Sequence, residues 1–592
     1  MAGLAQLARE AGHSVIGSDS NVYPPMSDFL RDAGIRVHEG WDPSTLDPAP
    51  DLVVIGNALS RGNPMVETVL DRGLPYTSGA QWVAEHVLRD RLVIAVAGTH
   101  GKTTTSSMAA WILERAGLAP GFLIGGIPND FGVPARLGRG RCFVIEADEY
   151  DTAFFDKRSK FVHYRPTVAL LNNLEYDHAD IFPDLAAIQT QFHHLLRTVP
   201  PRGTVVWNGD DANLAAVLAR GCWSQQLRFG VGAADWRLAS RDDTGFELVT
   251  GAGPARALRS TLPGRHNALN AVGALAACAV AGADVDAGLD ALARFGGVRR
   301  RMELRGVVDG IAVYDDFAHH PTAVAATIAA LRGRAGSGRL IAVLEPRSNT
   351  MRAGVHREEL ADSLAGADLV YLYDPPNLAW DLRGATAALG ERRQLLPSVA
   401  SLVDALSAIH AGPQAVEDLR RTMAEILTAF RPGRNAFLSS LFTGQRVEKV
   451  LFAATKADHL HHTQHPRLTA IIDAMLRDAR DRADFAGAQT AAMAIASVRA
   501  TVEEEVNRDG QTVHAVRGRL QSTGRMATMY AGELPADPAR LMAPAREGAE
   551  RWLDADYQVM SFAPARMTLA PGDGPPHIRL DRAAEFLIGD RL

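Results

Sequence analysis

Residues 91–105 read RLVIAVAGTHGKTTT, and this stretch decides the fold of the chain around it. The first seven residues form an apolar run rich in β-branched side chains, which predicts a buried strand. A glycine-containing turn follows at 98–103, and residues 106–116 have the composition of a helix. A strand, a glycine-rich turn and a helix in this order predict a phosphate-binding loop within an α/β domain.

The residue types of this loop suit a nucleotide phosphate. Gly98 and Gly101 let backbone N–H groups approach phosphate oxygens, and the start of the helix adds partial positive charge. Lys102 can reach the β- and γ-phosphates, and the Thr103 hydroxyl can bind Mg²⁺. The standard loop has an earlier glycine where this chain has Val96, so the loop is a variant. The alternative is a structural strand-to-helix turn without a ligand.

Two acidic segments follow further apolar runs. Residues 144–151 read VIEADEYD, and residues 171–180 read LNNLEYDHAD. A carboxylate and an imidazole at the ends of two neighbouring strands could hold Mg²⁺ beside a nucleotide. Either segment alone is more typical of a solvated loop. The phosphate loop upstream favours the metal-binding interpretation.

The length and composition describe a soluble, multidomain protein. A chain of 592 residues predicts three or four domains of about 100–200 residues each. Apolar residues make up 47% and charged residues 22%, as in ordinary globular proteins. No apolar run is long enough for a membrane helix, and residues 1–6 lack the features of a signal peptide. We therefore expect a cytoplasmic protein without an integral membrane segment.

Charge and cysteine content exclude further classes. The 62 basic and 68 acidic residues give a net charge of −6, so we expect no nucleic-acid partner. The cysteines are few, odd in number and far apart, which predicts reduced thiols at positions 142, 222 and 278. Lysine is rare beside arginine, and two of its positions, Lys102 and Lys456, lie in nucleotide-type motifs.

Strands and helices alternate over most of the chain, which predicts parallel α/β layers. In the first unit we expect strands at 13–19 and 51–57. A unit that begins near Val298 has expected strands at 311–314, 340–344 and 367–373. The sequence pattern changes near residue 410. After this point we expect a helix at 415–430 and a strand at 450–454.

The order of the motifs resembles that of the Mur ligases, the ATP-dependent amide-forming enzymes of peptidoglycan synthesis. Six motifs occur in sequence: GTHGKTTT at 98–105, EADEYD at 146–151, NNLEYDHAD at 172–180, GRHNALNA at 264–271, RRRME at 299–303 and DDFAHHPT at 315–322. The resemblance implies a Rossmann-like UDP-binding domain, a P-loop central ATPase and a Rossmann-like C-terminal domain. The stretches EPRSNTM at 345–351 and QTQFHHL at 189–195 resemble the branch that acts in peptidoglycan recycling.

That branch implies a reaction between UDP-N-acetylmuramate and the tripeptide L-alanyl-γ-D-glutamyl-meso-diaminopimelate. The lactyl carboxylate attacks the γ-phosphate of ATP to form an acyl phosphate, and the amine of the tripeptide then displaces phosphate. Positive charge from Lys102 and Mg²⁺ offsets the repulsion between the two anions. The resemblance also implies roles in cell-wall biogenesis, cell shape, cell division and the cell cycle.

The resemblance assigns site residues position by position. The implied catalytic residues are Lys102, Glu146 and His178. The implied Mg²⁺ ligands are Thr103 for a first ion and Glu146 and His178 for a second. The implied nucleotide contacts are Gly98, Thr99, His100, Gly101, Lys102, Thr103, Thr104, His266, Asn267, Asn270, Arg301 and Asp316. The implied substrate contacts are Asp19, His319 and Arg347. Some relatives carry a carbamylated lysine after the DH motif, but this chain has Gln189 and Gln191 there, so no carbamate is expected.

Residues 411–592 resemble a different family, the YcjX-like P-loop GTPases. The segments that carry this resemblance are FAATKADH at 452–459, IASVRAT at 495–501, PHIRLD at 576–581 and EFLIGD at 585–590. In the TKAD element, Asp458 would pair with the guanine base and the stem of Lys456 would cover its ring. The segment contains no phosphate loop of its own, which predicts that it is a partial GTPase-like domain.

The two resemblances divide the chain into four expected parts. Residues 1–87 form a UDP-sugar-binding domain without its first strand, and residues 88–297 form the ATP-binding domain. Residues 298–410 form a truncated third ligase domain, and residues 411–592 form the YcjX-like fragment. The favoured function is therefore ATP-dependent ligation. The alternatives are a GTP-binding stress protein and a catalytically impaired fusion of the two families.

Overall fold

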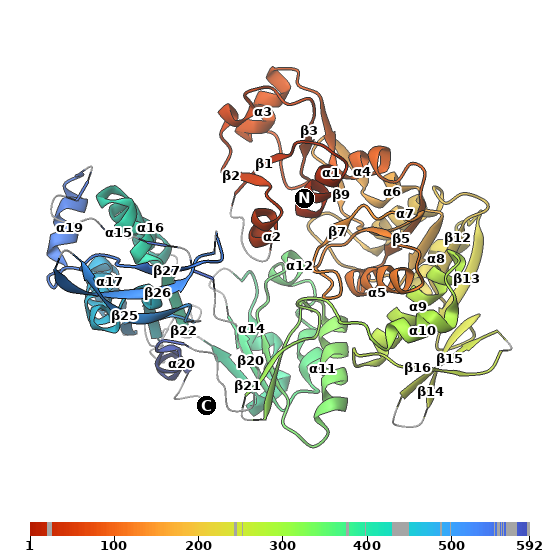
Figure 1. Cartoon of the computed structure of the whole chain (residues 1–592). Helices are drawn as coiled ribbons and strands as arrows, with labels where there is room; N and C mark the ends of the chain where they lie inside the picture. The colour runs from red at the N-terminus through yellow and green to blue at the C-terminus, as the bar shows by residue number, and fades with distance from the viewer. Residues whose placement is uncertain are drawn as a thin grey trace.

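A computed structural model gives the arrangement of the chain (Figure 1). It describes residues 1–20, 26–241, 245–251, 253–308, 310–374, 378–396, 398–428, 449–485, 488–497, 499–508, 510–521, 523–549, 551–552, 557, 559–560, 562–563 and 577–588. The proline- and glycine-rich stretch at 569–576 therefore lies outside the described residues. No helix among the described residues is both long and apolar enough to cross a bilayer.

A ten-stranded sheet forms the centre of the ligase-like part. The apolar run at 91–97 forms an inner strand of this sheet, β5 (Leu92–Ala97), which pairs in parallel with β11 (Val168–Leu171) and β8 (Cys142–Glu146). Strands β6 and β11 to β14 continue the parallel pairing, whereas β7, β15 and β16 are antiparallel to their neighbours. In sheet order the strands are β16 (Arg256–Leu258), β15 (Gly245–Thr250), β14 (Trp236–Arg241), β13 (Gln225–Gly230), β12 (Thr204–Asn208), β11 (Val168–Leu171), β5, β8 (Cys142–Glu146), β6 (Gly121–Leu123) and β7 (Ala135–Arg136).

Helices cover both faces of this sheet and bury two apolar clusters. One cluster lies under α5 (Lys102–Arg115), α9 (Arg265–Val280) and α10 (Val285–Leu292). Helix α5 begins at Lys102, four residues earlier than expected, so the lysine is the first residue of the helix. The opposite cluster lies under α1 (Ala2–Glu10), α4 (Gly79–His86), α6 (Phe161–Tyr164), α7 (Leu185–Leu196) and α8 (Ala212–Ala219), with the short hairpin β9 (Asp151–Ala153) and β10 (Asp156–Ser159) beside α6.

The N-terminal unit contains two separate pairs of parallel strands. Strand β1 (Ile16–Asp19) pairs with β2 (Arg36–Glu39), and β3 (Val53–Ile55) pairs with β4 (Tyr76–Ser78). Both expected strands exist but are shorter than predicted. Among the described residues no strand joins the pairs, so the Rossmann-like sheet is not continuous. The remaining elements of this unit are α2 (Met26–Asp32), η1 (Pro43–Leu46) and α3 (Pro64–Asp71).

The third ligase unit contains two small sheets. An antiparallel hairpin, β17 (Glu303–Val308) and β18 (Ile311–Asp315), precedes α11 (Pro321–Ala335). A parallel sheet follows, with β20 (Leu369–Tyr373) between β19 (Ile341–Leu344) and β21 (Arg393–Leu396). The other elements are α12 (Asn349–Arg352), α13 (Leu360–Leu364), α14 (Leu382–Ala385) and η3 (Ala387–Arg392). The expected strands at 311–314, 340–344 and 367–373 are thus present.

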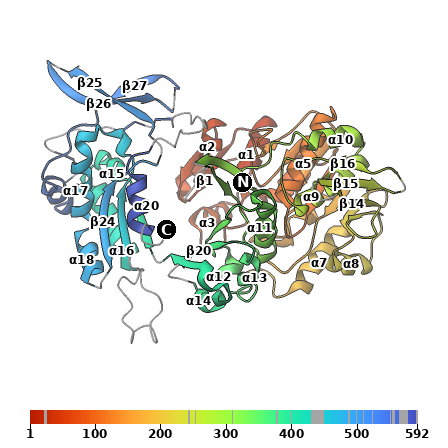
Figure 2. The same cartoon turned by 90° about the horizontal axis from the view of Figure 1, so that it is seen from below.

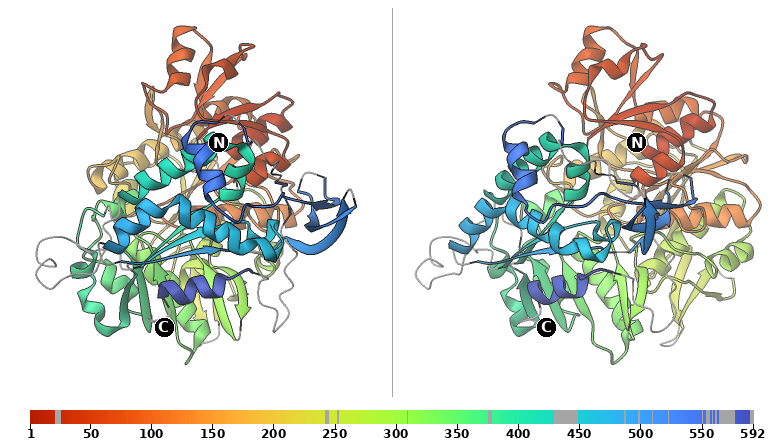
Figure 3. Two further views of the ribbon diagram at one scale, coloured as in Figure 1. Left: turned by 90° about the vertical axis from the view of Figure 1, so that its left-hand side faces the viewer. Right: turned by 60° about the vertical axis from the view of Figure 1, so that its left-hand side comes forward.

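The C-terminal unit has its own core and lies beside the third unit (Figures 1 and 3). Strand β23 (Lys449–Ala454) pairs in parallel with β22 (Ser398–Val403) and β24 (Gln489–Ala494). The chain therefore enters the C-terminal sheet at Ser398, before the boundary expected at residue 410, because the hydrogen bonds of β22 are made to β23. Helix α16 (Pro413–Thr428) covers most of the expected helix, and residues 429–430 lie outside the described residues.

The other elements of the C-terminal unit pack around this sheet. They are α15 (Ala405–Ala411), η4 (Ala457–His459), η5 (His462–Gln464), α17 (His465–Met475), α18 (Arg477–Phe485), β25 (Thr501–Arg508), β26 (Gln511–Arg519), β27 (Met526–Met529), α19 (Ala539–Arg546) and α20 (Leu580–Ile588). Strands β25, β26 and β27 form a separate antiparallel sheet at one edge of the unit (Figure 2). The three cysteines are free thiols, as expected.

Candidate active site

The turn between β5 and α5 brings backbone N–H groups to the end of the central sheet. Gly98 has φ 143° and Gly101 has φ 78°, which are conformations that favour glycine. A Cβ atom on Gly101 would lie 2.6 Å from Oδ1 of Asn270, so the position has no room for a side chain. No side chain of the turn therefore covers the first N–H groups of α5, and these groups can approach a bound phosphate, as a phosphate loop requires.

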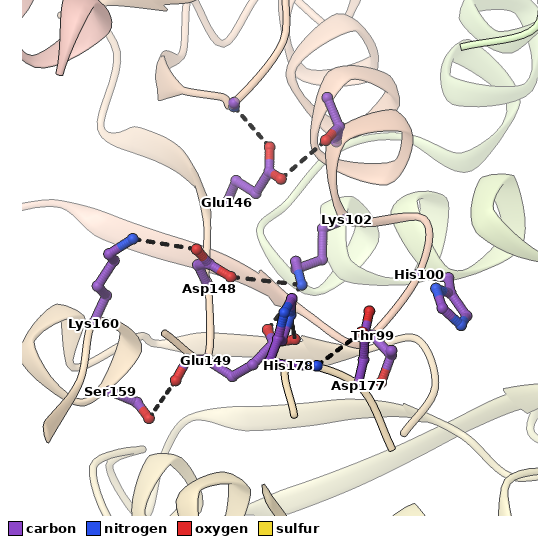
Figure 4. A network of polar contacts seen from close by, with 12 residues as sticks. Thr99, His100, Lys102, Glu146, Asp148, Glu149, Ser159, Lys160, Asp177 and His178 are labelled. Atoms are coloured by element: carbon purple, nitrogen blue, oxygen red, sulfur yellow. Dashed lines mark hydrogen bonds and ion pairs between the residues drawn. The ribbon is translucent and has the colours of Figure 1, made fainter. Parts of the chain in front are cut away.

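Lys102 lies in a buried cluster of charges (Figure 4). Its Nζ donates a hydrogen bond of 2.8 Å to Glu149 and lies 3.7 Å from Asp148. Burial alone would lower the pKa of Lys102, but the carboxylates of Glu149 and Asp148 raise it above its ordinary value. Burial would likewise raise the pKa of Glu149, yet Lys102 and His178 hold it at about 2. Both partners are therefore charged at neutral pH.

Glu146 and Thr103 form a second polar contact at the same sheet edge. The Thr103 hydroxyl donates to Oε1 of Glu146 over 2.9 Å, and the backbone N–H of Gly125 donates to Oε2 over 2.7 Å. Arg301 from the third unit donates to the Thr103 hydroxyl over 3.2 Å. The carboxylate and hydroxyl that we predicted as Mg²⁺ ligands therefore meet directly.

His178 lies opposite, on the loop that follows β11. Its Nε2 is 3.0 Å from Oε1 of Glu149, and its ring packs 4.2 Å from that of Tyr150. Burial would lower the pKa of His178, but the contact with Glu149 raises it. Glu146 and His178 thus have different partners. Two groups of side chains in this region lie within metal-binding reach of one another: Asp148, Glu149 and His178, and His100, Glu175 and His320.

The other predicted nucleotide contacts line one cavity of about 330 Å³ together with Lys102. They come from the loop at 99–104, from α9 and from the third unit: Thr99, His100, Gly101, Thr103, Thr104, His266, Asn267, Asn270, Arg301 and Asp316. Burial lowers the pKa of His266 to about 4, so its imidazole is neutral at pH 7. Burial raises the pKa of Asp316, whose carboxylate accepts backbone N–H groups of Met302 and Ala318.

The third unit is tied to the central unit by polar contacts near His178. The Thr350 hydroxyl donates to Oδ1 of Asp177 over 2.7 Å, and Asn349 donates to Asp180 over 3.0 Å. His319 lines the cavity and has its Nε2 3.8 Å from Oδ2 of Asp177. These contacts hold the two units together on either side of the cavity.

Three predicted residues lie away from this cavity. Gly98 shapes the turn behind it, where a Cβ would lie 3.0 Å from that of Asn172. Asp19 is exposed at the end of β1, and Arg347 is exposed before α12. The cavity lining includes neither Asp19 nor Arg347, so the structure does not bring these two to the other site residues.

Sequence reasoning missed the residues that pair with the predicted ones. Glu149 and Asp148 stand within the quoted EADEYD motif, but only their fold position shows that they hold Lys102. Asp177 and Thr350 are 173 residues apart, and no local pattern links them. The closely spaced acidic residues after a predicted strand, in the EADEYD motif, were the only local signal that could have pointed to Asp148 and Glu149.

The residues present fit a nucleotide with Mg²⁺. Two buried polar atoms at the cavity, Oδ2 of Asp177 and Nε2 of His320, have no hydrogen-bond partner among the described residues. The turn at Gly101 has no room for a Cβ. Beside it lie the buried Lys102 and the oxygen donors of Thr103 and Glu146. Oxygen donors of this kind are the ones that Mg²⁺ prefers.

Four family models match the chain. The Mur ligase family catalytic domain matches residues 1–91, the Mur ligase middle domain matches 96–278, and the Mur ligase glutamate ligase domain matches 300–419. The YcjX-like family, DUF463, matches residues 397–592. The last two matches overlap across β22 and α15, where the chain changes from one sheet to the other.

Individual relatives agree with these matches. The UDP-N-acetylmuramate--L-alanyl-gamma-D-glutamyl-meso-2,6-diaminoheptandioate ligase of Escherichia coli (strain K12) is 52% identical over 406 residues, covering 68% of this chain and 89% of the relative. The crystal structure of a murein peptide ligase from Psychrobacter arcticus 273-4 is 40% identical, with a TM-score of 0.55, and covers 77% of this chain and 93% of that chain. A UDP-N-acetylmuramate-alanine ligase from Thermotoga maritima shares the fold at 20% identity and a TM-score of 0.56.

Proposed function

Because the chain belongs to the Mur ligase family, we propose that it is an ATP-dependent amide ligase that joins UDP-N-acetylmuramate to L-alanyl-γ-D-glutamyl-meso-diaminopimelate. One observation carries the proposal. Lys102, Glu146 and His178 line the same cavity as Arg301 and Asp316 of the third unit. The Escherichia coli relative carries this substrate pair in its name. We propose further that the reaction serves peptidoglycan recycling in the cytoplasm, with the cell-shape and cell-division roles that follow from it.

ATP, when bound, supplies the phosphoryl group that turns the muramyl carboxylate into an acyl phosphate. Lys102 and the first-turn N–H groups of α5 offset the negative charge of the phosphates. Thr103 would hold one Mg²⁺, and Glu146 and His178 would hold a second, while the oxygens of Glu149 are engaged by Lys102 and His178. In the absence of ligand, Glu149 neutralises the buried lysine, so nucleotide phosphates would compete with this carboxylate for Nζ.

The third unit supplies the closing side of the cavity. Arg301 places a guanidinium against Thr103, and the Thr350–Asp177 bond keeps the two units together. Positioning the reacting groups and excluding water are the main contributions that a protein makes to phosphoryl transfer. We propose Asp316 as a nucleotide contact and His319 as a contact on the peptide side. We propose Asp19 and Arg347 as contacts to parts of the substrates that lie outside the cavity.

We propose the four-part division of the chain with one change, which is that the C-terminal unit begins at β22. Residues 1–87, 88–297 and 298 to about 396 would then carry the ligase chemistry. The test is a ligation assay with the full chain, ATP, Mg²⁺, UDP-N-acetylmuramate and the tripeptide. We expect tripeptide-dependent release of phosphate and formation of the UDP-muramyl-tripeptide. Absence of the product from a folded chain would overturn the proposal and leave the impaired fusion.

A GTP-binding role of the C-terminal unit is the second candidate, and one contact supports it. Oδ2 of Asp458 accepts the backbone N–H of Ala500 over 2.8 Å, which brings the TKAD element and the 495–501 loop together as a guanine site would need. The same bond, however, occupies the carboxylate oxygen that would read the base. A thermal-shift experiment with GTP and ATP tests this candidate, and protection by GTP alone would favour it.

A further inference from the structure

Three histidines and a glutamate gather on the C-terminal unit, outside the ligase cavity. His461 and His462 lie at the start of η5, Glu503 lies on β25, and His514 lies on β26. We refer to these four residues as the His–Glu cluster. In the register of the hairpin, Glu505 lies opposite His514 and Glu503 opposite Val516, so the two glutamates and His514 share one face of the sheet. That face points toward η5.

The nitrogen and oxygen atoms of the cluster converge. Nδ1 of His462 is 2.7 Å from Oε2 of Glu503, and Nε2 of His461 is 3.6 Å from the same oxygen. The ligand atoms of His461, His462 and Glu503 lie within 4.8 Å of one another. Two imidazole nitrogens and one carboxylate oxygen at this separation can reach a single ion, because zinc binds such atoms at about 2.0–2.2 Å.

Neighbouring contacts orient the ligand atoms of the cluster toward one another. Nδ1 of His461 is engaged with the Thr463 hydroxyl over 2.9 Å, which leaves Nε2 facing Glu503. Arg499 lies 3.3 Å from the other oxygen of Glu503, so it fixes the carboxylate without covering Oε2.

A third imidazole closes one side of the cluster. The ring of His514 stacks on that of His461, with centroids 4.4 Å apart and planes 20° apart. Its Nδ1 is buried and has no hydrogen-bond partner among the described residues, and it lies 3.7 Å from Glu505. This atom can accept a hydrogen bond from, or donate one to, a water molecule on the metal. Nitrogen-rich sets of this kind favour zinc-class cations over Mg²⁺ and Ca²⁺.

We propose that His461, His462 and Glu503 form a binding site for a zinc-class divalent cation with one position open to water. The ion would tie η5 to the β25–β26 hairpin. Glu503 follows Ala500 and Thr501, which both bond to Asp458 of the TKAD element, so the site would fix the same loop from its other side. The proposal concerns the C-terminal unit and is independent of the ligase reaction.

The test uses the full chain, stripped with a chelator and titrated with Zn²⁺ in the presence of a chromophoric competitor. We expect one tight equivalent, and we expect His462→Gln and Glu503→Gln each to weaken it by at least about tenfold. His462 is 66% exposed in its side chain, so its replacement should leave the fold intact. The matched control is His577→Gln, since His577 is paired with one carboxylate only, Asp581 at 3.9 Å.

Two further variants separate this site from the ligase cavity, where Asp148, Glu149 and His178, or His100, Glu175 and His320, could also bind zinc. His178→Gln and His320→Gln should each keep the tight equivalent, and its loss in either of them with retention in His462→Gln would overturn the proposal. Substitution with Co²⁺ gives an independent readout, because nitrogen ligation changes the visible absorption of the ion. Equal affinity and equal spectra for wild type, His462→Gln and His577→Gln would also overturn it.

Discussion

Two lysines, Lys102 and Lys456, follow buried parallel strands, yet their surroundings differ. Lys102 begins a helix of 14 residues after a turn that contains two glycines with positive φ, and its side chain is 12% exposed. Lys456 has φ 60° and precedes the three-residue η4, and its side chain is 38% exposed. It donates to Ser407 and pairs with Asp404 at 2.6 Å.

The difference shows what a lysine needs in order to serve phosphate. At Lys102, backbone N–H groups, a helix N-terminus and oxygen donors for a metal converge on one cavity. At Lys456, the cation is satisfied by a neighbouring helix start, and η4 is too short to provide a comparable dipole. We therefore expect substitutions on the two sides to separate cleanly in a ligation assay.

The largest expected effect is that of Lys102→Ala. Removal of the ammonium leaves phosphate charge uncompensated, and it also leaves the buried Glu149 without its cation. We expect the ligation rate to fall by at least about 10²-fold. The control is Lys157→Ala, which removes an exposed lysine paired with Asp151. Circular dichroism of both variants would show whether the loss reflects unfolding, and unchanged turnover in folded Lys102→Ala would contradict the site.

A smaller effect is expected for Glu146→Gln. The amide keeps the shape and can still meet the Thr103 hydroxyl, but it removes the negative charge that would bind Mg²⁺. We expect the Mg²⁺ concentration for half-maximal ligation to rise by about 10- to 100-fold. A magnesium titration of turnover measures this. If only the maximal rate changed and the titration midpoint did not, Glu146 would not be a metal ligand.

The hydrogen bond between Thr350 of the third unit and Asp177 of the central unit predicts a smaller loss of ligation activity when it is removed. Thr350→Val removes the hydroxyl that donates to Asp177 while it keeps the side-chain volume. A hydrogen bond to a charged acceptor contributes about 1.5–3 kcal/mol, so complete loss of this contribution in the closed state would lower kcat/KM by about 10- to 100-fold. Thr386→Val provides the comparison, because the Thr386 hydroxyl donates to the Leu382 carbonyl within the third unit and does not line the cavity. If both variants lowered kcat/KM equally, the loss would reflect a general disturbance of the third unit, and the role of the Thr350–Asp177 contact would be contradicted.

The buried His266 predicts a pH dependence of stability on the ligase side. Its pKa is held at about 4 in the folded chain and is near 6.5 when unfolded, so the unfolded state binds more protons between these values. Stability is therefore lost as the pH falls from about 6.5 toward 4. The hydrogen-exchange protection factors of peptides from α9, which are corrected for the intrinsic pH dependence of exchange, should fall over this window, and His266→Gln should reduce that fall. An unchanged pH profile in that variant would contradict the assignment.

The smallest expected effect is that of Lys456→Ala. Because Lys456 contacts only groups of the C-terminal unit in the contacts described above, we expect ligation to change by less than about twofold, within the range of an exposed ion pair. The same variant should weaken any GTP protection in a thermal-shift experiment. A large loss of ligation would break the comparison, since it would show that the two units act on one reaction.

Local patterns allowed much of the fold to be predicted. The run at 91–97, the strands at 311–314, 340–344 and 367–373, and the helix at 415–430 agree with the structure to within a few residues. The N-terminal sheet could not be predicted in detail, because pairing of β1 with β2 and of β3 with β4 depends on contacts between distant segments. The change of sheet at β22 was missed for the same reason.

The sequence by itself determined the order of motifs, the phosphate loop and the residue types that can bind phosphate and a divalent cation. These features are local, because glycine conformation, helix start and side-chain chemistry depend on a few neighbouring residues. Only the tertiary structure decided that Glu149 is the partner of Lys102, that Thr350 reaches Asp177, and that His461, His462 and Glu503 converge. Such pairs join strands and loops that are far apart in the chain, and packing alone fixes their distances.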